Sequence, residues 1–507
     1  MVVSRFLPRA NIFVRAMSSA VKPSLKNPAL FREQSLVNGK WINAKSGEVF
    51  PVFDPATGNK IGDCPEHTAE EYAVAVEQAR EAFDGFKKFT HRERSNMLKR
   101  WSQLLTENVD DLAKILSWEN GKPLAEAKGE IAVCALNFDW FAEEAPRIYG
   151  ETIPSQAPDV RIHTIKQPIG VCAIITPWNF PASMISRKVG AAVAAGCSSV
   201  IKPAAETPYS ALAMAYLGEE AGIPKGVINV LTTNKNVKDV GRELCEHKLV
   251  AKVSFTGSTN VGKVLMRQAA STVKKVSFEL GGNAPFIVFG DADVSAAAEG
   301  AVASRFRGSG QTCICANRFY VHEDVYDEFA EKFAAKVAAL KVGPGLAEGT
   351  QQGPLINKAG IDKVARHVED AVNKQGKVLT GGKRLTEIGE NFYAPTVIAN
   401  GTAEMVINKE ETFGPLAVLI KFKTFDEVVK LANDTEYGLA AYVYSRNISN
   451  VHKITEALEV GMIGVNRGLI TESSLPFGGV KESGFGRETS KYGLDDYLVI
   501  KSVAVAL

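Results

Sequence analysis

The sequence predicts an α/β protein built on parallel, doubly wound sheets. Short apolar runs such as residues 171–175 alternate with helical patterns, and Gly196 and Gly222 stand where those helices should end. Continuous apolar strands between helices are typical of a parallel sheet that is covered on both faces. The 507 residues predict several lobes, because a domain takes about 150 residues.

A first alternation of strands and helices covers residues 33–148 and 169–278. Thr68 and Glu71 match a capping box, which predicts that an early helix begins there. Strands are expected at residues 171–175, 199–201, 227–231 and 250–255, and a helix is expected over residues 260–270. We interpret these residues as one α/β lobe.

A second alternation follows Glu279 and predicts another α/β lobe over residues 279–480. Its strands are expected at residues 286–289, 416–421 and 462–465. Residues 160–167 alternate between polar and apolar side chains and lie outside both lobes. They predict either a protruding strand that pairs with a partner subunit or an internal edge strand.

The composition limits the classes of partner. Lys and Arg number 59 against 57 acidic residues, so a net charge of +2 gives no general attraction to nucleic acid or to an anionic membrane. No run approaches about 18 apolar residues, so a membrane span is not expected. The seven cysteines are odd in number and mostly scattered, which indicates a reducing compartment rather than a disulfide framework.

Residues 1–32 form a basic leader that contains no acid, since the first acidic residue is Glu33. Such a leader is typical of a mitochondrial presequence, and the alternative is a basic tail on a cytosolic protein. Met17 offers a second start that would remove most of the leader. The expected location is therefore the mitochondrial matrix, the cytoplasm or both.

Cys313 is the first candidate for chemistry. It follows Gly308-Ser309-Gly310, whose backbone can approach a ligand closely and turn its N–H groups toward it. A thiolate favoured there by nearby positive charge or N–H dipoles is a strong nucleophile, whereas simple packing is the alternative for one cysteine. Cys315 completes a Cys-x-Cys pair, but no second pair or His cluster lies nearby, so no metal is expected.

Glu279 is the second candidate, because it directly follows a strand pattern and precedes two glycines. A carboxylate at a strand end can reach into a cleft and act as a general base, and a solvated surface carboxylate is the alternative. Residues 257–264 nearly match a P-loop, but Val264 replaces the Ser or Thr that holds magnesium, so nucleotide hydrolysis is not expected. The glycine turn can still present N–H groups to a dinucleotide pyrophosphate.

Seven motifs in a fixed order resemble the aldehyde dehydrogenase superfamily. They are Pro177-Trp178-Asn179-Phe180-Pro181, Lys202-Pro203, Phe255-Thr256-Gly257-Ser258, Glu279-Leu280-Gly281-Gly282, Gly310-Gln311-Thr312-Cys313, Glu411-Thr412-Phe413-Gly414-Pro415 and Pro476-Phe477-Gly478-Gly479. The resemblance covers nearly everything from near residue 35 to the end. It implies a Rossmann-type parallel-sheet cofactor domain, an α/β catalytic domain and a small β oligomerisation element in a homodimer or homotetramer. The implied boundaries are residues 33–148 and 169–278, residues 279–480, and residues 149–168 and 481–507, respectively.

The resemblance also implies catalytic roles. Cys313 resembles the nucleophile that adds to an aldehyde carbonyl and becomes a thioester. Asn179, with the backbone N–H of Cys313, looks like the oxyanion hole, where donors meet developing negative charge. Glu279 resembles the base that activates water to hydrolyse the thioester, and Lys188 is implied as support around it.

The implied cofactor is NADP or NAD. The residues implied in binding it are Thr176, Pro177, Trp178, Lys202, Ala205, Glu206, Gly257, Ser258, Glu411 and Phe413. NAD-preferring members commonly carry a carboxylate three residues after the lysine, where this chain has Ala205, and the acid comes one position later at Glu206. Because a missing like charge admits a 2′-phosphate, we predict NADP use, with NAD as the alternative if Glu206 takes that place.

Two arginines narrow the substrate. Arg187 and Arg307, with the Cys-x-Cys pair, are similar to the pattern of succinate-semialdehyde dehydrogenases, which implies a role in 4-aminobutyrate degradation. Two guanidinium groups suit a substrate carboxylate, and structural ion pairs are the alternative. Thr471 stands where that group usually has a serine, so the width of the pocket is open.

Several alternatives stay open at this point. Glutarate semialdehyde differs from succinate semialdehyde by one methylene, worth about 1–3 kcal/mol in binding. A CoA-acylating dehydrogenase or a non-catalytic relative would be expected to lack Glu279 or Cys313, and both are present. Cys315 resembles a second cysteine that forms a reversible disulfide with the nucleophile, although that bond requires backbone movement.

Overall fold

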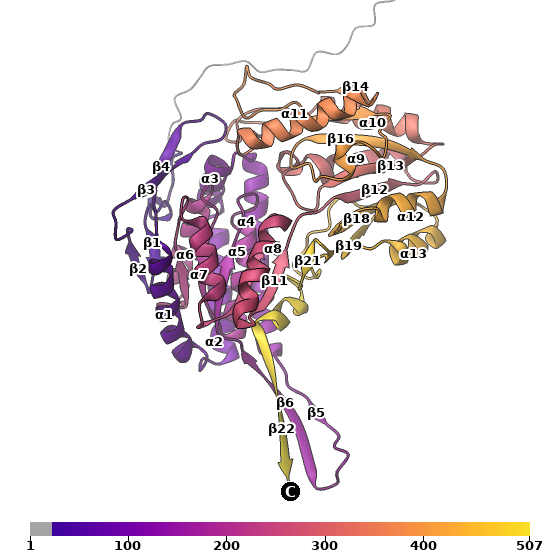
Figure 1. Cartoon of the computed structure of the whole chain (residues 1–507). Helices are drawn as coiled ribbons and strands as arrows, with labels where there is room; N and C mark the ends of the chain where they lie inside the picture. Colours follow the sequence, from indigo (N-terminus) through magenta and orange to yellow (C-terminus); the bar gives the residue numbers. More distant parts are fainter. Residues whose placement is uncertain (1–22) are drawn as a thin grey trace, which may run out of the picture.

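The computed structural model describes residues 23–507, so the first 22 residues of the predicted leader, including Met17, lie outside the described residues. Figure 1 shows two α/β lobes and a narrow three-stranded arm that projects away from them, with the C-terminus at its tip. Within residues 23–507 no helix has the length and apolar character needed to cross a membrane.

The first lobe is built on an eight-stranded sheet in the order β2-β1-β9-β8-β7-β10-β11-β21. The five central strands β9, β8, β7, β10 and β11 are parallel. At the two edges the pairs β1–β9, β1–β2 and β11–β21 are antiparallel. The strands are β1 (Ser35–Val37), β2 (Lys40–Ile42), β7 (Val171–Ile175), β8 (Ser198–Lys202), β9 (Ile228–Val230), β10 (Val250–Thr256), β11 (Lys275–Glu279) and β21 (Gly484–Phe485). The predicted parallel sheet is confirmed.

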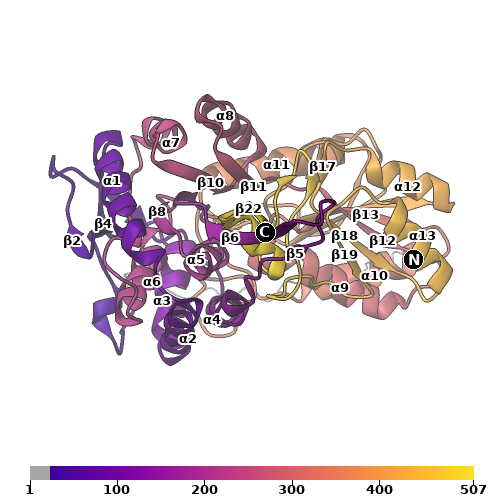
Figure 2. The same cartoon turned by 90° about the horizontal axis from the view of Figure 1, so that it is seen from below.

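Helices cover both faces of this sheet, as Figure 2 shows with α1, α7 and α8 on one side and α2 to α6 on the other. Their bounds are α1 (Ala69–Phe86), α2 (His91–Glu107), α3 (Val109–Asn120), α4 (Leu124–Glu144), α5 (Ser183–Ala195), α6 (Pro208–Glu220), α7 (Val237–Glu246) and α8 (Thr259–Ala269). The predicted capping box is present at the start of α1, where Thr68 N donates to Glu71 (3.0 Å).

The strand order places several predicted site residues at one edge of the first sheet. From β7 the chain builds outward to β9 and then returns to β10 on the other side of β7. Parallel α/β sheets bind ligands outside their carboxyl ends at such a reversal. Lys202 and Glu279 end β8 and β11, and the register pairs Lys202 with Ile175 and Glu279 with Thr256.

The second lobe has a seven-stranded sheet in the order β14-β15-β16-β13-β12-β18-β19, in which β14 alone is antiparallel to its neighbour. The strands are β12 (Ala284–Val288), β13 (Ala316–His322), β14 (Lys377–Thr380), β15 (Thr396–Ala399), β16 (Leu416–Phe422), β18 (Ala440–Tyr444) and β19 (Met462–Val465). The main helices are α9 (Val294–Phe306), α10 (Tyr326–Ala338), α11 (Lys358–Asn373), α12 (Phe425–Asn433) and α13 (Ile448–Ala457). Cys313 and Glu411 precede β13 and β16, so they lie at the amino edge of this sheet.

The arm consists of β5 (Thr152–Ile153), β6 (Val160–Pro168) and β22 (Leu498–Ala506). Strand β6 pairs antiparallel with β22 along its whole length. Of residues 481–507, which we assigned to this element, β22 joins it but β21 pairs with β11 of the first sheet. The pairing with β11 requires glycine at position 484, where φ is +107° and a Cβ would overlap the Phe278 carbonyl. The extent of the oligomerisation element stays a prediction.

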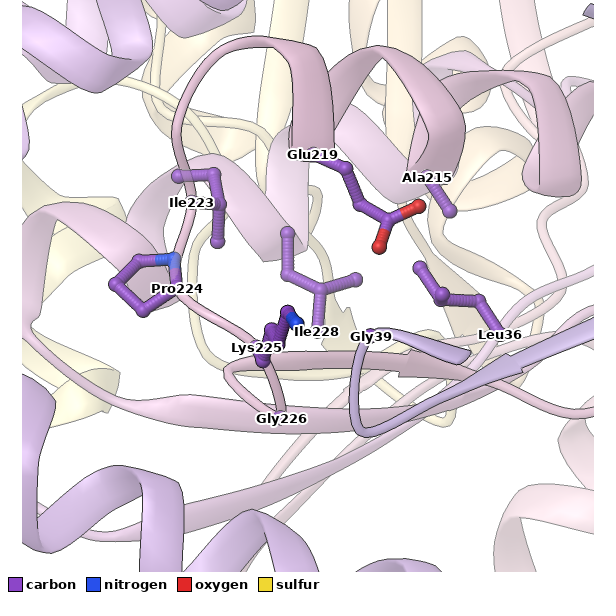
Figure 3. Close-up of a pocket in the computed structure, with 9 residues that line it drawn as sticks. All are labelled: Leu36, Gly39, Ala215, Glu219, Ile223, Pro224, Lys225, Gly226 and Ile228. Atoms are coloured by element: carbon purple, nitrogen blue, oxygen red, sulfur yellow. The ribbon is translucent and has the colours of Figure 1, made fainter. Parts of the chain in front are cut away.

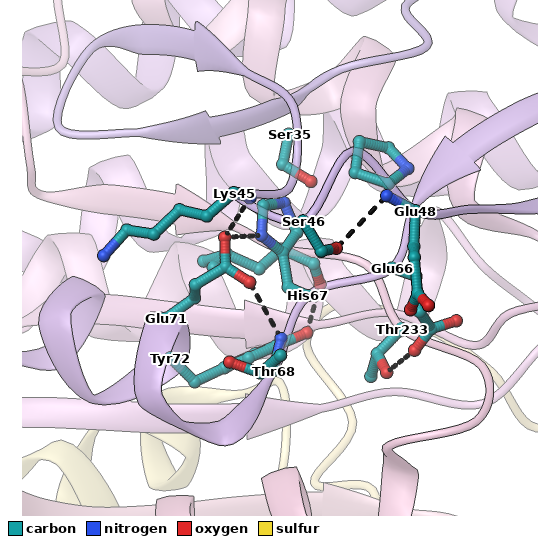
Figure 4. A network of polar contacts seen from close by, with 12 residues as sticks. Ser35, Lys45, Ser46, Glu48, Glu66, His67, Thr68, Glu71, Tyr72 and Thr233 are labelled. Atoms are coloured by element: carbon teal, nitrogen blue, oxygen red, sulfur yellow. Dashed lines mark hydrogen bonds and ion pairs between the residues drawn. The ribbon is translucent and has the colours of Figure 1, made fainter.

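A hairpin of β3 (Val49–Phe53) and β4 (Lys60–Pro65) is attached to the first lobe by buried polar contacts (Figure 4). Glu71 accepts the backbone N–H of Lys45 (2.8 Å) and lies 3.0 Å from His67 Nδ1. Glu66 accepts the Thr233 hydroxyl (2.5 Å) and several N–H groups at the start of α7. The network therefore ties the hairpin to the loop that follows β9.

Two hollows contain none of the predicted site residues. Figure 3 shows one between α6 and the turn that ends in Gly39, with a volume of about 10 Å³, which is room for about one water molecule. The other is an open groove of about 630 Å³ between the start of α4 and residues 341–351. Neither is the site that the motifs predict.

Candidate active site

The site lies where the chain crosses from the first sheet to the second. Glu279 ends β11, and residues 280–283 lead directly to β12. A Cβ on Gly282 would lie 2.4 Å from the Cys313 carbonyl oxygen, and one on Gly281 would lie 3.1 Å from Glu411 Oε2. The two glycines therefore let the crossing pass directly against the nucleophile segment and Glu411.

The segment before Cys313 is a tight turn. Gly308, Ser309 and Gly310 all have positive φ values of 58°, 56° and 74°. A side chain on Gly310 would overlap the Gly414 carbonyl, so the glycine is required for the close approach. The turn leaves Cys313 partly exposed, while Cys315 points into the interior.

The resting thiol of Cys313 is not activated by positive charge. Burial raises its pKa well above the usual range, the carboxyl groups of Glu411 and Glu279 raise it further, and Arg187 opposes them. In the resting site burial and two acids thus outweigh one guanidinium, and the nucleophilic role of Cys313 stays a prediction. The cysteine needs a base to ionise.

Glu279 is the predicted general base. Its side chain is 3% exposed, which rules out the solvated alternative. Burial and the nearby Glu488 raise its pKa well above the usual range, although Lys188 and Arg187 oppose the shift. Among residues 23–507 its Oε2 has no hydrogen-bond partner. A buried carboxyl group with a raised pKa can accept and return a proton near neutral pH.

Lys188 lies close to Glu279 but is paired with another acid. It projects from α5, is fully buried and forms an ion pair with Glu488. Glu488 was not predicted from the sequence, because it lies in a glycine-rich segment without any helical or strand pattern. Its backbone pairs with Phe477 (N···O 2.8 and 2.9 Å), so the recognised motif around Phe477 was the signal nearest to it.

Asn179 is placed against the nucleophile segment. It lies in the loop between β7 and α5 (residues 176–182, the Asn179 loop) and is 7% exposed. Its Nδ2 donates to the Gln311 carbonyl (3.0 Å), two residues before Cys313. Its Oδ1 has no partner in the described part of the chain. The amide that we predict as the oxyanion donor therefore contacts the segment that leads to Cys313.

The two arginines lie against aromatic rings. Arg187 on α5 is 5% exposed and sits over Phe477 (4.3 Å to the ring centre), and Arg307 sits over Phe180 (5.5 Å). Within residues 23–507 the Nε and Nη1 of Arg187 have no hydrogen-bond partner. Because unpaired buried donors are costly, this guanidinium fits an anionic ligand better than a structural ion pair.

Thr471 lies in the loop after β19, is partly buried and follows the buried Ile470. Its contribution to the substrate pocket stays a prediction.

The adenosine end of the expected cofactor site is built around Lys202. The lysine is 6% exposed, and burial lowers its pKa to about 8, although Glu206 and Glu66 oppose the shift. Ala205 is partly buried and Glu206 is exposed. The buried hydroxyls of Thr176 and Thr256 have no hydrogen-bond partner among the residues described. These free polar groups fit a nucleotide.

The turn after β10 leads into α8. Ser258 caps this helix by accepting the N–H of Val261 (3.4 Å), and Gly257 precedes it. Lys263, at the P-loop lysine position, forms an ion pair with both oxygens of Glu482 (2.7 Å each). An internal carboxylate thus satisfies the lysine, which agrees with setting the P-loop interpretation aside.

The nicotinamide end is formed by the second lobe. Glu411 Oε1 accepts the N–H of Gly282 (3.0 Å), and burial raises its pKa to about 7. Phe413 contacts Trp178 edge-to-face at 5.7 Å, which joins the two lobes at this point. The residues predicted for the two ends of the cofactor therefore belong to different lobes.

Comparison with known proteins agrees with this geometry. The model of the aldehyde dehydrogenase family matches residues 41–503. The chain belongs to the aldehyde dehydrogenase family. A Saccharomyces cerevisiae protein named succinate-semialdehyde dehydrogenase (NADP(+)) is 53% identical over 96% of this chain and 98% of its own. A Pseudomonas putida glutarate-semialdehyde dehydrogenase is 54% identical over 95% of this chain and 100% of its own.

Solved structures show the same fold. The crystal structure of succinate-semialdehyde dehydrogenase from Burkholderia pseudomallei has a TM-score of 0.94 and 55% identity, and the match covers 96% of this chain and 100% of that one. The predicted aldehyde dehydrogenase fold, with its Rossmann-type sheet, is confirmed.

The surroundings of Cys315 differ from those of Cys313. Cys315 is 1% exposed, its thiol lies 3.6 Å from the Arg305 carbonyl, and burial raises its pKa. Both thiols are free. Within residues 23–507 no group of three His, Cys, Asp or Glu side chains is arranged to hold a metal ion. A disulfide between Cys313 and Cys315 stays a prediction.

Proposed function

We propose that this chain is an NADP-using succinate-semialdehyde dehydrogenase, which oxidises the aldehyde to succinate. The observation that carries the substrate assignment is the buried guanidinium of Arg187, whose Nε and Nη1 have no partner within residues 23–507. In support of this, the positive charge of Arg187 opposes the rise that burial causes in the pKa of the Cys313 thiol. A four-carbon semialdehyde carries its carboxylate on the opposite end from the reacting carbonyl, which suits this arrangement.

In the proposed reaction Cys313 loses its proton to Glu279, and its Sγ bonds to the aldehyde carbon. The Asn179 amide and the Cys313 backbone N–H stabilise the negative carbonyl oxygen. A bound nicotinamide would supply the acceptor for the hydride that leaves this carbon. Glu279 passes the thiol proton to solvent and then takes a proton from the water that attacks the Cys313 thioester. The C–S bond breaks to give carboxylic acid and thiolate, the proton of the acid passes to the sulfur, and Glu279 releases its second proton to solvent.

Cofactor choice rests on the charge around Lys202. Ala205 introduces no carboxylate at the position where NAD-preferring relatives have one, and Glu206, the next residue, is exposed. The cationic Lys202 therefore suits a 2′-phosphate, and we propose NADP with weaker use of NAD.

Glutarate semialdehyde is the second candidate substrate, because a relative named for it is as similar to this chain as one named for succinate semialdehyde. A CoA-acylating reaction has less support, because Glu279 is present and buried. A requirement for CoA in turnover would reverse that choice.

The substrate assignment is tested with Arg307→Ala. Removing the guanidinium should raise KM for succinate semialdehyde at least about tenfold, since charged hydrogen bonds contribute about 1.5–3 kcal/mol, and should change KM for butanal little. The matched control is Arg242→Ala, an exposed arginine on α7. Steady-state kinetics with NADP measures both. An equal loss for both aldehydes would show that Arg307 does not bind the carboxylate.

We further propose that the protein is a homodimer or homotetramer that pairs through the arm. On β22, Ile500 is 68% exposed and Val505 is 45% exposed. Apolar side chains on an exposed edge strand are unfavourable in water and are typical of a surface that pairs with another chain. Light scattering on the unmodified protein and on Ile500→Lys should show a smaller assembly for the variant. A monomeric unmodified protein would contradict the proposal.

For location we propose import into the mitochondrial matrix through the basic leader, with a cytoplasmic form that starts at Met17. The support is the acid-free composition of residues 1–32. A fluorescent fusion of the full chain should enter mitochondria, and one that begins at Met17 should stay in the cytoplasm. A cytoplasmic full-length fusion would contradict import.

A further inference from the structure

The Asn179 loop is mostly buried, with Pro177, Trp178 and Phe180 partly exposed, and it belongs to neither a strand nor a helix. Buried backbone groups need hydrogen-bond partners, and this loop has few from regular structure. Helix α5, which follows it, begins at Ser183 without any capping side chain from its own N-cap, Ala182. The partners of the loop come instead from residues 120–130, at the junction of α3 and α4.

Two side chains of the α3–α4 turn bind the carbonyl groups of the loop. Asn120 Nδ2 donates to the Trp178 carbonyl (2.9 Å). Lys122 Nζ donates to the carbonyl of Asn179 itself (2.8 Å) and lies over the Phe180 ring (3.9 Å to its centre). The residue that carries the oxyanion amide is thus held through its own backbone.

Glu130 on α4 binds the other end of the loop. One carboxylate oxygen accepts the N–H groups of Ala182 (3.0 Å) and Ser183 (3.1 Å), and so caps α5 from outside. The other oxygen accepts from Lys122 Nζ at 2.5 Å. The side chains of Lys122 and Glu130 are 3% and 0% exposed.

We propose that the Lys122–Glu130 ion pair is a positioning unit that sets the place of the oxyanion amide of Asn179. A buried ion pair adds little net stability, because desolvation of both charges offsets their attraction. What this pair supplies is a double attachment that fixes the loop at Asn179 and again at Ala182. The same pair positions the Phe180 ring, over which the Arg307 guanidinium lies.

The backbone of Lys122 is itself held from the second lobe. A Cβ on Gly345 would lie 2.3 Å from the Lys122 carbonyl oxygen, and one on Gly353 would lie 2.2 Å from that of Gly121. Ser117 Oγ also donates to the Lys122 carbonyl (2.7 Å). Contacts from both lobes therefore fix the point from which the lysine reaches Asn179.

The test uses Lys122→Met together with Glu130→Gln, because a single change would leave one buried charge alone. The inference rests on the proposed aldehyde oxidation, so kcat is compared on whichever aldehyde the unmodified enzyme turns over. We expect kcat to fall about tenfold to a hundredfold for charged and uncharged aldehydes alike, as small misplacements of catalytic groups do, with little change in NADP affinity or melting temperature.

The matched control is Lys128→Met with Asp110→Asn, which removes an exposed ion pair (2.8 Å) made by the same helix. It should keep kcat within about twofold, because an exposed pair contributes little. In an Asn179→Ala background the Lys122 and Glu130 changes should have almost no further effect on kcat, since residues that act as a unit are non-additive. If the pair were only structural, the double change would lower the melting temperature. Its loss of kcat would then multiply with the loss that Asn179→Ala causes.

A crystal structure of the pair variant gives a readout that does not depend on activity. The Asn179 amide should be displaced by more than about 0.5 Å, the tolerance of a catalytic constellation. Unchanged kcat, a fully multiplicative loss with Asn179→Ala or an undisplaced amide would each overturn the inference. Lack of turnover of succinate semialdehyde by the unmodified enzyme would instead overturn the proposed function.

Discussion

Two buried polar clusters meet at Asn179, and they differ in how completely their atoms are paired. On the cleft side, Asn179 Oδ1, Arg187 Nε and Glu279 Oε2 have no partner within the described chain. On the α4 side, both oxygens of Glu130 and the ammonium of Lys122 have partners. Burial is similar in the two clusters, so burial alone does not identify a catalytic group.

This difference in pairing indicates which buried residues act on a ligand and which hold the chain in place. Unpaired buried polar atoms are rare in folded proteins and need an explanation such as a ligand or a reacting group. Paired ones hold the chain in place. Changes on the cleft side should therefore reduce chemistry while folding is retained, and changes in internally paired groups elsewhere should affect turnover only if they move a cleft residue.

The largest expected effect on the cleft side is that of Cys313→Ser. Product formation should fall by at least about 10³-fold, because an alcohol is a far weaker nucleophile than the thiolate it replaces. Steady-state NADPH formation measures the loss, and fluorescence titration with NADP should show unchanged binding. Turnover at the unmodified rate would contradict the thioester route.

The next effect is that of Glu279→Gln, which should lower kcat by about 10²–10⁴-fold. Because the pKa of Glu279 is raised above that of an ordinary carboxyl group, its base form increases toward higher pH, so kcat of the unmodified enzyme should rise with pH. The Gln variant has no group to ionise there and should lose that dependence. A pH profile of kcat from 6 to about 9 compares them. The same slope in both proteins would assign the proton transfer to another group.

A smaller effect is expected where a carboxylate is added beside a cleft cation. Ala205→Glu should lower the NADP-to-NAD ratio of kcat/KM by at least about tenfold, because like charges brought together cost several kcal/mol. Glu206→Gln is the control and should leave the ratio unchanged or higher. If Ala205→Glu leaves the ratio unchanged, the cofactor choice is made by other residues.

The smallest effect is expected at the internally paired Lys263. Its ion pair with Glu482 is partly exposed, with side chains 42% and 36% exposed. Lys263→Met should therefore cost about 0–1 kcal/mol of unfolding free energy and leave kcat unchanged. Thermal unfolding and steady-state kinetics measure the two. A large loss of kcat would show that the lysine acts on a ligand despite its carboxylate partner.

Local patterns predicted the elements of both lobes. The capping box at Thr68 and the apolar run over residues 171–175 depend on neighbours close in the chain, so they can be read without the fold. The same holds for the glycines before Cys313, since a tight turn depends mainly on the residues that form it. Glu279 at a strand end was predicted for the same reason.

Other features depend on pairs far apart in the chain. The partner of Lys188 is 300 positions away at Glu488, and the partner of β11 at its outer edge is β21 rather than a neighbour in sequence. No periodic pattern in the sequence predicts such contacts. The pKa of the Cys313 thiol likewise depends on distant residues, because burial and the carboxyl groups of Glu411 and Glu279 raise it.

The sequence by itself determined the family, the order of strands and helices, and the residue types of the chemistry. These follow from local periodicity and short motifs, which the chain carries along its length. The tertiary structure decided which buried polar atoms are paired and which are left for a ligand, because pairing is settled when distant segments pack. Glu130 illustrates this: its carboxylate is one of many in the sequence, and its partners Lys122, Ala182 and Ser183 are revealed by folding.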